Sequence, residues 1–221
     1  MTASAQDVVK TFRQSLDARA AFEVPYRHYT ISRALPADVI TELNTLPFKA
    51  PGLEGVSGRR ELHNNTRSYF DVANMAKYPV MRAVADAFQD QSIVNYIAER
   101  FEAPIDDTFL RLEYAMDIDG FWLEPHTDLG VKKFTCLLYL SDEAGHEDLG
   151  TDMYVSKEQH FGRAPFVPGN AMIFVPSDNT WHGFEKRAIN GVRKSVILNY
   201  VTHEWKAREQ LSFPEAPVRV G

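Results

Sequence analysis

The stretch HGFEKRAINGVRKSVILNYVT, residues 182–202, decides the fold. Its Asn-Gly pair at 190–191 is a strong turn signal between two β-type runs. If this pair closed a flat two-residue hairpin, His182 would lie opposite Asn199. Arg193 would then lie six residues away from that pair, about 20 Å distant at the usual strand rise. A small molecule would barely bridge that gap, so joint action of His182 and Arg193 requires strands that cross between two sheets.

The rest of the chain divides into a helical part and a β-rich part. Helical spacing of apolar residues predicts helices over 3–20, 36–46 and 78–101, with a strand over 22–31. The expected buried set of the third helix is Val80, Met81, Val84, Phe88, Ile93, Tyr96 and Ile97. From residue 108 onward, β-type runs lie at 109–116, 133–140, 153–155, 171–175 and 193–202. A mainly β protein with an N-terminal helical layer is therefore expected.

Composition restricts the class of protein. The 221 residues are 44% hydrophobic and 24% charged, with a net charge of −6, as in a soluble globular domain. The acidic balance argues against a nucleic-acid partner, and the sequence shows neither a membrane-spanning run nor a secretory signal. A single cysteine excludes an intrachain disulfide. We expect one cytoplasmic domain, 1–221, with a helix-rich layer at 1–105, a β-rich core at 106–205 and a tail at 206–221.

A histidine and an aspartate form the first half of a candidate metal site. His126 and Asp128 are one residue apart, so in extended backbone both side chains point the same way. A neutral nitrogen combined with a hard carboxylate suits iron or manganese. A bare His-x-Asp also occurs at surface strand ends without a metal. Here, however, the pair lies between the apolar segments 121–125 and 133–141, where isolated polar groups are costly.

The second half of the candidate site comes from the opening stretch. His182 follows a sharp Pro-Gly-Asn turn at 168–170 and a buried strand, although a lone histidine among aromatic residues is more often a core residue. Arg193 begins a strand that is apolar on both faces, so an inward guanidinium needs an anion. A carboxylate is its natural bidentate partner, and Ser195 on the same face adds a hydroxyl donor.

In this order and spacing, the residues resemble the motif of the iron(II)- and 2-oxoglutarate-dependent dioxygenases. That motif is His-x-Asp, a distal His and an Arg-x-Ser about ten residues later, here His126, Asp128, His182, Arg193 and Ser195. The resemblance covers about residues 108–203. The strand at 135–140 and the Pro-Gly turn at 168–169 resemble the prolyl-hydroxylase-like branch of this superfamily in particular.

The resemblance implies a double-stranded β-helix, or jelly roll, that holds Fe²⁺ and uses 2-oxoglutarate and O₂. Arg193 and Ser195, together with Tyr114, would hold the distal carboxylate of 2-oxoglutarate. Hydroxylation of a C–H bond coupled to succinate formation is the implied reaction, with desaturation or ring closure as variants. The chain departs from the branch at 148–152, which reads DLGTD in place of a Gly-Gly-Glu-Thr-like turn, so prolyl hydroxylation is not implied.

The substrate is less well defined by the sequence. Arg67 and Arg111 are candidates to contact an anionic or hydroxylated substrate, and Asn199 is a candidate for the pocket wall. Each of them also fits an ordinary role in a salt bridge or in the core. We expect a small molecule, and the oligomeric state is left open.

Two alternatives accompany this interpretation. One is a protein side-chain hydroxylase, whose substrate would order the Gly-rich and charged segment at 51–66. The other is a cupin-type metal-binding protein that is not an oxygenase. Cupin sites resemble His-x-His with a later Glu and His, and they would leave Arg193 without a purpose.

Overall fold

The computed structural model describes residues 4–53, 58–59, 67–128 and 130–221. Its helices are α1 (Ala5–Asp17), α2 (Ala37–Asn44), α4 (Val72–Lys77), α5 (Pro79–Gln89) and α6 (Gln91–Phe101). Its strands are β1 (Ala20–Phe22), β2 (His28–Ile31), β3 (Ser68–Tyr69), β4 (Phe109–Asp117), β5 (Leu123–His126), β6 (Lys132–Tyr139), β7 (Asp152–Ser156), β8 (Gln159–Arg163), β9 (Ala171–Phe174), β10 (His182–Phe184) and β11 (Arg193–Val201).

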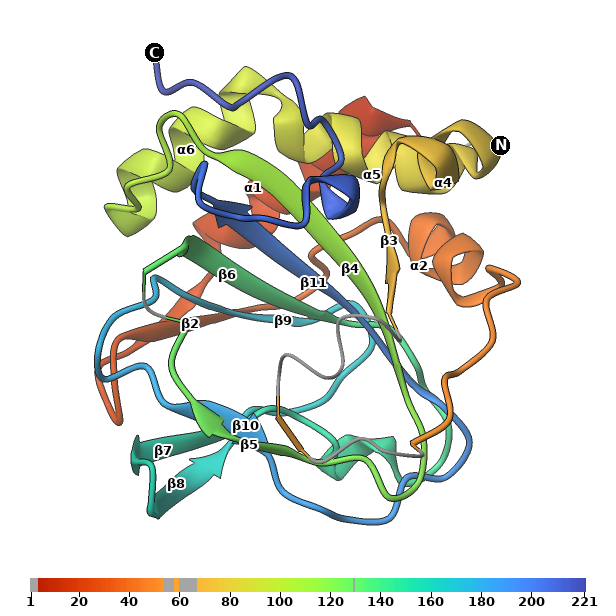
Figure 1. Ribbon diagram of the computed structural model, residues 1–221, viewed down its shortest axis with the longest axis vertical. Helices are drawn as coiled ribbons and strands as arrows, with labels where there is room; N and C mark the ends of the chain where they lie inside the picture. Colours follow the sequence, from red (N-terminus) through yellow and green to blue (C-terminus); the bar gives the residue numbers. More distant parts are fainter. Residues whose placement is uncertain (1–3, 54–57, 60–66, 129) are drawn as a thin grey trace.

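The strands form two antiparallel sheets. The larger has the order β1-β2-β9-β6-β11-β4-β3, and the smaller has the order β5-β10-β7-β8. Figure 1 shows the helices on one side of the larger sheet and the smaller sheet on the other. The predicted crossing is confirmed, because β10 belongs to the smaller sheet and β11 to the larger one. The Asn-Gly turn signal therefore lies between two sheets and does not close a flat hairpin.

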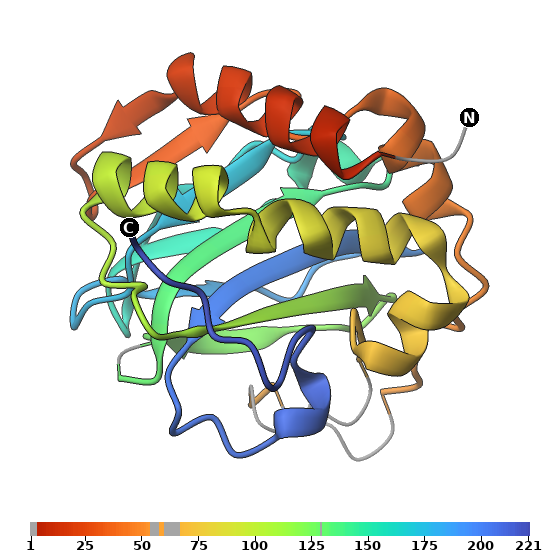
Figure 2. The same cartoon turned by 90° about the horizontal axis from the view of Figure 1, so that it is seen from above.

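Alternation along β4, β6 and β11 separates the two faces of the larger sheet. Even-numbered residues of these strands, such as Cys136 and Leu198, lie in the main hydrophobic core. The helices α1, α5 and α6 cover this face, as Figure 2 shows. The hydroxyl of Tyr200 donates to the backbone oxygen of Phe88 in α5, which ties the sheet to the helical layer. The odd-numbered residues therefore face the smaller sheet.

The helix expected over 78–101 is in fact two helices. Asp90 interrupts it with an extended backbone, and its carboxylate accepts a hydrogen bond from the backbone N–H of Ser92. Aspartate at this position caps the first turn of α6, which a spacing of apolar residues cannot reveal. The expected buried set of this region is buried in both helices.

The strands predicted from residue 108 onward recur with small shifts of their ends. The single strand predicted over 22–31 is instead an antiparallel pair, β1 and β2. The strands β3, β5, β8 and β10 were not predicted, and each is only two to five residues long. The N-terminal part also supplies β1, β2 and β3 to the larger sheet, so it is not purely a helical layer. Most of the segment at 51–66, which a protein substrate was expected to order, lies outside the described residues.

Within the described ranges, every helix is too short or too polar to cross a lipid bilayer.

Candidate metal centre

Two neighbouring strands of the smaller sheet bring the predicted histidines together. His126 ends β5, His182 begins β10, and the two residues are direct partners in the antiparallel ladder. Their ring centroids lie 4.4 Å apart. Glycine is required beside them, because a Cβ on Gly183 would lie 2.7 Å from the backbone oxygen of Leu123. The sequence His-Gly therefore allows β10 to approach β5 closely enough to pair the imidazoles.

Hydrogen bonds fix the tautomer of both histidines. The Nδ1 of His126 lies 2.9 Å from the backbone oxygen of Glu124, and the Nδ1 of His182 lies 2.9 Å from that of Thr180. A carbonyl can only accept, so each Nδ1 carries the proton. In the neutral rings, Nε2 then carries the lone pair that a metal requires.

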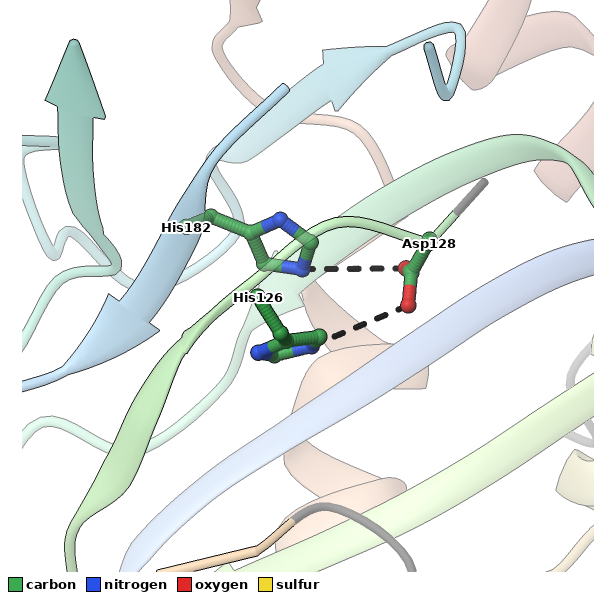
Figure 3. Close-up of side chains that lie close together, drawn as sticks. All are labelled: His126, Asp128 and His182. Atoms are coloured by element: carbon green, nitrogen blue, oxygen red, sulfur yellow. Dashed lines mark ion pairs between the residues drawn. The ribbon is translucent and has the colours of Figure 1, made fainter. Parts of the chain in front are cut away.

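Asp128 faces both of these nitrogens, as Figure 3 shows. Its Oδ1 lies 3.7 Å from the Nε2 of His126, and its Oδ2 lies 3.6 Å from the Nε2 of His182. One ligand atom from each residue lies within 4.8 Å of the others. Lys132 also donates to Oδ1 at 2.7 Å. The three predicted ligands thus form one cluster whose two nitrogens and one carboxylate fit a divalent iron or manganese ion.

The cluster opens into a pocket between the two sheets. The pocket is lined by Arg67, Asp117, Phe121, Leu123, His126, Asp128, Lys132, Thr135, Leu137, Tyr139, Thr151, His182, Gly183, Phe184, Arg193, Ser195 and Ile197. Arg193 and Ser195, from the larger sheet, therefore share one pocket with His182 from the smaller sheet. This is the arrangement that the spacing argument required.

The anion that an inward Arg193 requires is supplied by the chain itself. Arg193 is buried, and its Nη1 donates to the Oδ2 of Asp117 at 2.5 Å. Its Nε donates to the backbone oxygen of Leu149 at 2.7 Å. A guanidinium has five N–H donors, so these two bonds orient it and leave donors for a second anion. Asp117 is the cross-strand partner of Arg193 in the ladder between β4 and β11.

Arg67 belongs to the same pocket and shares this carboxylate. Its Nη1 lies 2.6 Å from the Oδ1 of Asp117, and its Nε lies 3.4 Å from the Oε1 of Glu113. The guanidinium also lies over the ring of Phe121, 5.2 Å from the centroid. Arg67 therefore lines the pocket, where Asp117 holds two arginines at the wall, and its contact with a substrate stays a prediction.

Tyr139 is a pocket residue that the sequence reasoning missed. Its hydroxyl donates to the Oγ1 of Thr151, and it pairs with Ser195 across the ladder between β6 and β11. Burial raises the pKa of Tyr139, while the bond with Thr151 and the charge of Arg193 act in the opposite direction. The tyrosine is therefore a neutral donor close to Arg193.

Tyr114, predicted as a third carboxylate contact, lies on the opposite face of the sheet. Its ladder partner is Val196, and both residues belong to the core beneath the helices. Its hydroxyl donates to the backbone oxygen of Leu43 at 2.8 Å. The prediction for Tyr114 is wrong because the period of two along β4 turns even-numbered side chains away from the pocket. Tyr139, an odd-numbered residue like Ser195 and its ladder partner, lies on the pocket face instead.

The predictions that Arg111 and Asn199 contact a substrate are also corrected. Both side chains are fully buried and lie outside the pocket lining. Arg111 donates to Glu113 at 2.7 Å, and its guanidinium lies over the rings of Tyr69 and Trp205. These residues form a polar network behind the pocket, and they reach its contents only through other side chains.

A second group of potential ligands lies on the smaller sheet. Asp152, His160 and Glu185 also bring ligand atoms within 4.8 Å of one another. The carboxylate of Asp152, however, accepts from Arg163 at 2.8 Å and from Arg187 at 2.6 Å. Two guanidinium groups at one carboxylate oppose the binding of a cation. We therefore assign this group to stability and not to metal binding.

The comparisons with known proteins concern the fold. No family model and no curated protein sequence matches the chain. Among solved structures, a prolyl 4-hydroxylase from Phytophthora capsici is similar, with 18% identity and a TM-score of 0.59, over 94% of this chain and 68% of that one. A Pseudomonas putida prolyl-4-hydroxylase has 13% identity and a TM-score of 0.53, over 89% and 95%.

HygX from Streptomyces hygroscopicus, solved with nickel and 2-oxoglutarate bound, has 14% identity and a TM-score of 0.50, over 87% of this chain and 90% of that one. SnoN, a non-heme α-ketoglutarate-dependent epimerase from nogalamycin biosynthesis, has 14% identity and a TM-score of 0.51, over 90% and 82%. These similarities extend over most of each protein. The chain therefore has the fold shared by prolyl 4-hydroxylases and other 2-oxoglutarate-dependent oxygenases.

Proposed function

We propose that the protein is an iron(II)- and 2-oxoglutarate-dependent dioxygenase that hydroxylates a C–H bond of a small molecule. The observation that carries the proposal is the shared pocket of His126, Asp128, His182 and the buried Arg193. A metal site alone would fit many reactions. A metal site that faces an arginine across a pocket is suited to a metal-chelating molecule with a distant carboxylate. Two facing antiparallel sheets would be the double-stranded β-helix of this class.

His126, Asp128 and His182 would hold the metal. Two imidazoles and one carboxylate on one side leave the opposite coordination positions for other molecules. With Fe²⁺ there, 2-oxoglutarate and O₂ would supply the oxidising power for hydroxylation, with release of succinate and CO₂. The protein contributes fixed histidine tautomers, which keep Nε2 directed at the metal position without a proton to displace.

Arg193 would bind the distal carboxylate of 2-oxoglutarate. The bonds to Leu149 and Asp117 hold its guanidinium in one orientation, so less conformational entropy is lost when the cosubstrate binds. Ser195 lines the pocket on the same strand and adds a hydroxyl. Tyr139, also at the pocket wall, adds a neutral hydroxyl on the neighbouring strand, whose hydrogen would turn from Thr151 to the carboxylate. A charge-assisted bond to a carboxylate in such a buried place is strong.

The substrate would occupy the part of the pocket near Arg67 and Phe121. Apolar side chains, among them Leu123 and Phe184, line the pocket together with the charged groups. A pocket between two sheets favours a small molecule over a folded protein surface. Hydroxylation of a peptide is the second candidate, because two of the similar solved structures are prolyl 4-hydroxylases.

The direct test supplies the purified protein with Fe²⁺, 2-oxoglutarate and O₂ and measures succinate. We expect slow succinate formation without substrate, and faster formation when a panel of metabolites includes the right one. A panel of proline-containing peptides tests the second candidate. The His182→Ala variant is the negative control. Absence of succinate from the wild type, together with no stabilisation by 2-oxoglutarate and Mn²⁺, would favour the cupin-type alternative.

A further inference from the structure

A buried polar chain connects the larger sheet to the carboxylate of the candidate metal site. It runs from Arg111 through Asn199 and Thr135 to Asp128. Arg111 and Asn199 are fully buried, and Thr135 is almost so. The sequence had indicated contact of the first two with substrate. Their position behind the pocket calls for another role.

The first link fixes the orientation of an amide. The Nη1 of Arg111 donates to the Oδ1 of Asn199 at 3.4 Å. A guanidinium can only donate, so the carbonyl oxygen of the amide must face it. Arg111 itself is held by Gln210 at 3.0 Å and by Glu113 at 2.7 Å. The amide nitrogen of Asn199 therefore points the other way.

The second link fixes the direction of a hydroxyl. The Nδ2 of Asn199 donates to the Oγ1 of Thr135 at 2.9 Å. A hydroxyl that accepts from an amide has its own hydrogen available for another acceptor. That acceptor is the Oδ2 of Asp128, 3.4 Å away. This distance is long for an O–H···O bond, so the contact is weak and its main effect is on the orientation of the carboxylate.

The two oxygens of Asp128 are thus held from two sides. Thr135 directs its hydrogen at Oδ2, and Lys132 donates to Oδ1 at 2.7 Å. Two donors, one to each oxygen, fix the plane of the carboxylate relative to the histidines. Partners behind a metal ligand commonly change metal affinity by about 10–100-fold.

We infer that Asn199 and Arg111 are positioning residues for Asp128, which act by directing the Thr135 hydroxyl toward its Oδ2. The inference rests on the proposed metal site. It predicts that metal affinity depends on a hydrogen-bond donor toward Thr135 at position 199. It also predicts that metal affinity depends on a hydroxyl group at position 135.

The variant Asn199→Asp tests the direction of the chain. A carboxylate still accepts from Arg111 and preserves the shape, but it cannot donate to Thr135, so the hydroxyl hydrogen turns toward residue 199. We expect Mn²⁺ affinity to fall about tenfold, measured from the electron paramagnetic resonance signal of unbound Mn²⁺. An added negative charge alone would strengthen cation binding, so a loss of affinity has the opposite sign to a simple charge effect.

Variants at position 135 complete the test. Thr135→Val should lower Mn²⁺ affinity to a similar extent, Thr135→Ser should restore it, and Asn199→Asp should have little further effect in the Thr135→Val background. Thr108→Val is the matched control, since Thr108 is equally buried and its hydroxyl donates to the backbone oxygen of Ile105. Thermal unfolding of each variant reports whether it folds.

The outcomes separate the inference from the proposed function. Wild-type Mn²⁺ affinity in folded Asn199→Asp and Thr135→Val proteins would overturn the inference and leave the metal site intact. An equal loss in Thr108→Val would overturn it as well, because general destabilisation would then explain the result. Failure of the wild type to bind Mn²⁺ would instead overturn the proposed function.

Discussion

Two groups of histidine and carboxylate side chains with similar ligand atoms lie on or beside the smaller sheet. His126, Asp128 and His182 form one, and Asp152, His160 and Glu185 form the other, each with ligand atoms within 4.8 Å of one another. They differ in what surrounds the central carboxylate. Asp152 accepts from two arginines and from the backbone N–H of Glu185. Asp128 faces two histidine Nε2 atoms and a pocket, and a single ammonium group, that of Lys132, donates to its Oδ1.

The difference shows that proximity of ligand types does not define a metal site. The lone pairs of Asp152 are committed to guanidinium and backbone donors, so a cation there would have to displace them. In the other group, backbone carbonyls take the Nδ1 protons and leave Nε2 as the electron-pair donor. The group around Asp152 is built for stability, and the group around Asp128 has the features of a ligand set.

The largest expected effect separates the two groups directly. His182→Ala removes one of three proposed ligands, and we expect Mn²⁺ affinity to fall by more than about 100-fold, beyond the effect of a mere partner of a ligand. His160→Ala is the matched control in the other group and should leave Mn²⁺ affinity unchanged. Calorimetric titration measures both. Equal losses of Mn²⁺ affinity in the two variants would contradict the distinction between the two groups.

The next effect concerns two arginines, the buried Arg193 and the partly buried Arg187. Arg193→Ala should spare Mn²⁺ binding but weaken 2-oxoglutarate binding by about 3 kcal/mol, since hydrogen bonds to charged groups are lost. Arg187→Ala removes the arginine bonded to Asp152 and should leave 2-oxoglutarate affinity unchanged. Titration of the Mn²⁺-loaded proteins with 2-oxoglutarate compares them. Unchanged affinity in Arg193→Ala would show that its assignment is wrong.

A third prediction tests the stability role of Asp152. Burial alone would raise the pKa of this carboxyl, but its bonds from Arg187, Glu185 and Arg163 lower it below the usual 3.8. Because the folded pKa is the lower one, its stabilisation is present above the unfolded value and is lost as pH falls through the folded value. Asp152→Asn should therefore cost about 2 kcal/mol of unfolding free energy at neutral pH.

The same variant should become relatively less destabilised in acid. Urea unfolding at pH 7 and near pH 3 measures the difference between wild type and Asp152→Asn, which should shrink toward the lower pH. Mn²⁺ affinity should not change. A difference that stays constant over this range would mean that the charge of Asp152 contributes little.

The smallest effect tests which face of the larger sheet belongs to the pocket. Tyr114→Phe removes one hydrogen bond to Leu43 beneath the helices and should cost about 1 kcal/mol of stability. It should not change 2-oxoglutarate affinity, whereas Tyr139→Phe should weaken it. Weaker binding in Tyr114→Phe would reverse our correction.

Sequence patterns predicted the residues of the candidate metal site better than the residues that surround it. Spacing around the Asn-Gly turn was sufficient to require two sheets, because a flat hairpin separates His182 from Arg193 too widely. The same patterns missed Asp117 and Tyr139, since their relevance depends on the ladder register with Arg193 and Ser195. Arg111 and Asn199 were misassigned because burial behind a pocket and exposure within it look the same in a strand sequence.

The most direct test is a titration of the wild-type protein with Mn²⁺ and then with 2-oxoglutarate, without oxygen. We predict one Mn²⁺ bound per chain, lost in His182→Ala and kept in His160→Ala, and 2-oxoglutarate binding that depends on the bound metal. Binding of 2-oxoglutarate with equal affinity with and without Mn²⁺, or Mn²⁺ binding that survives in His182→Ala, would contradict the account.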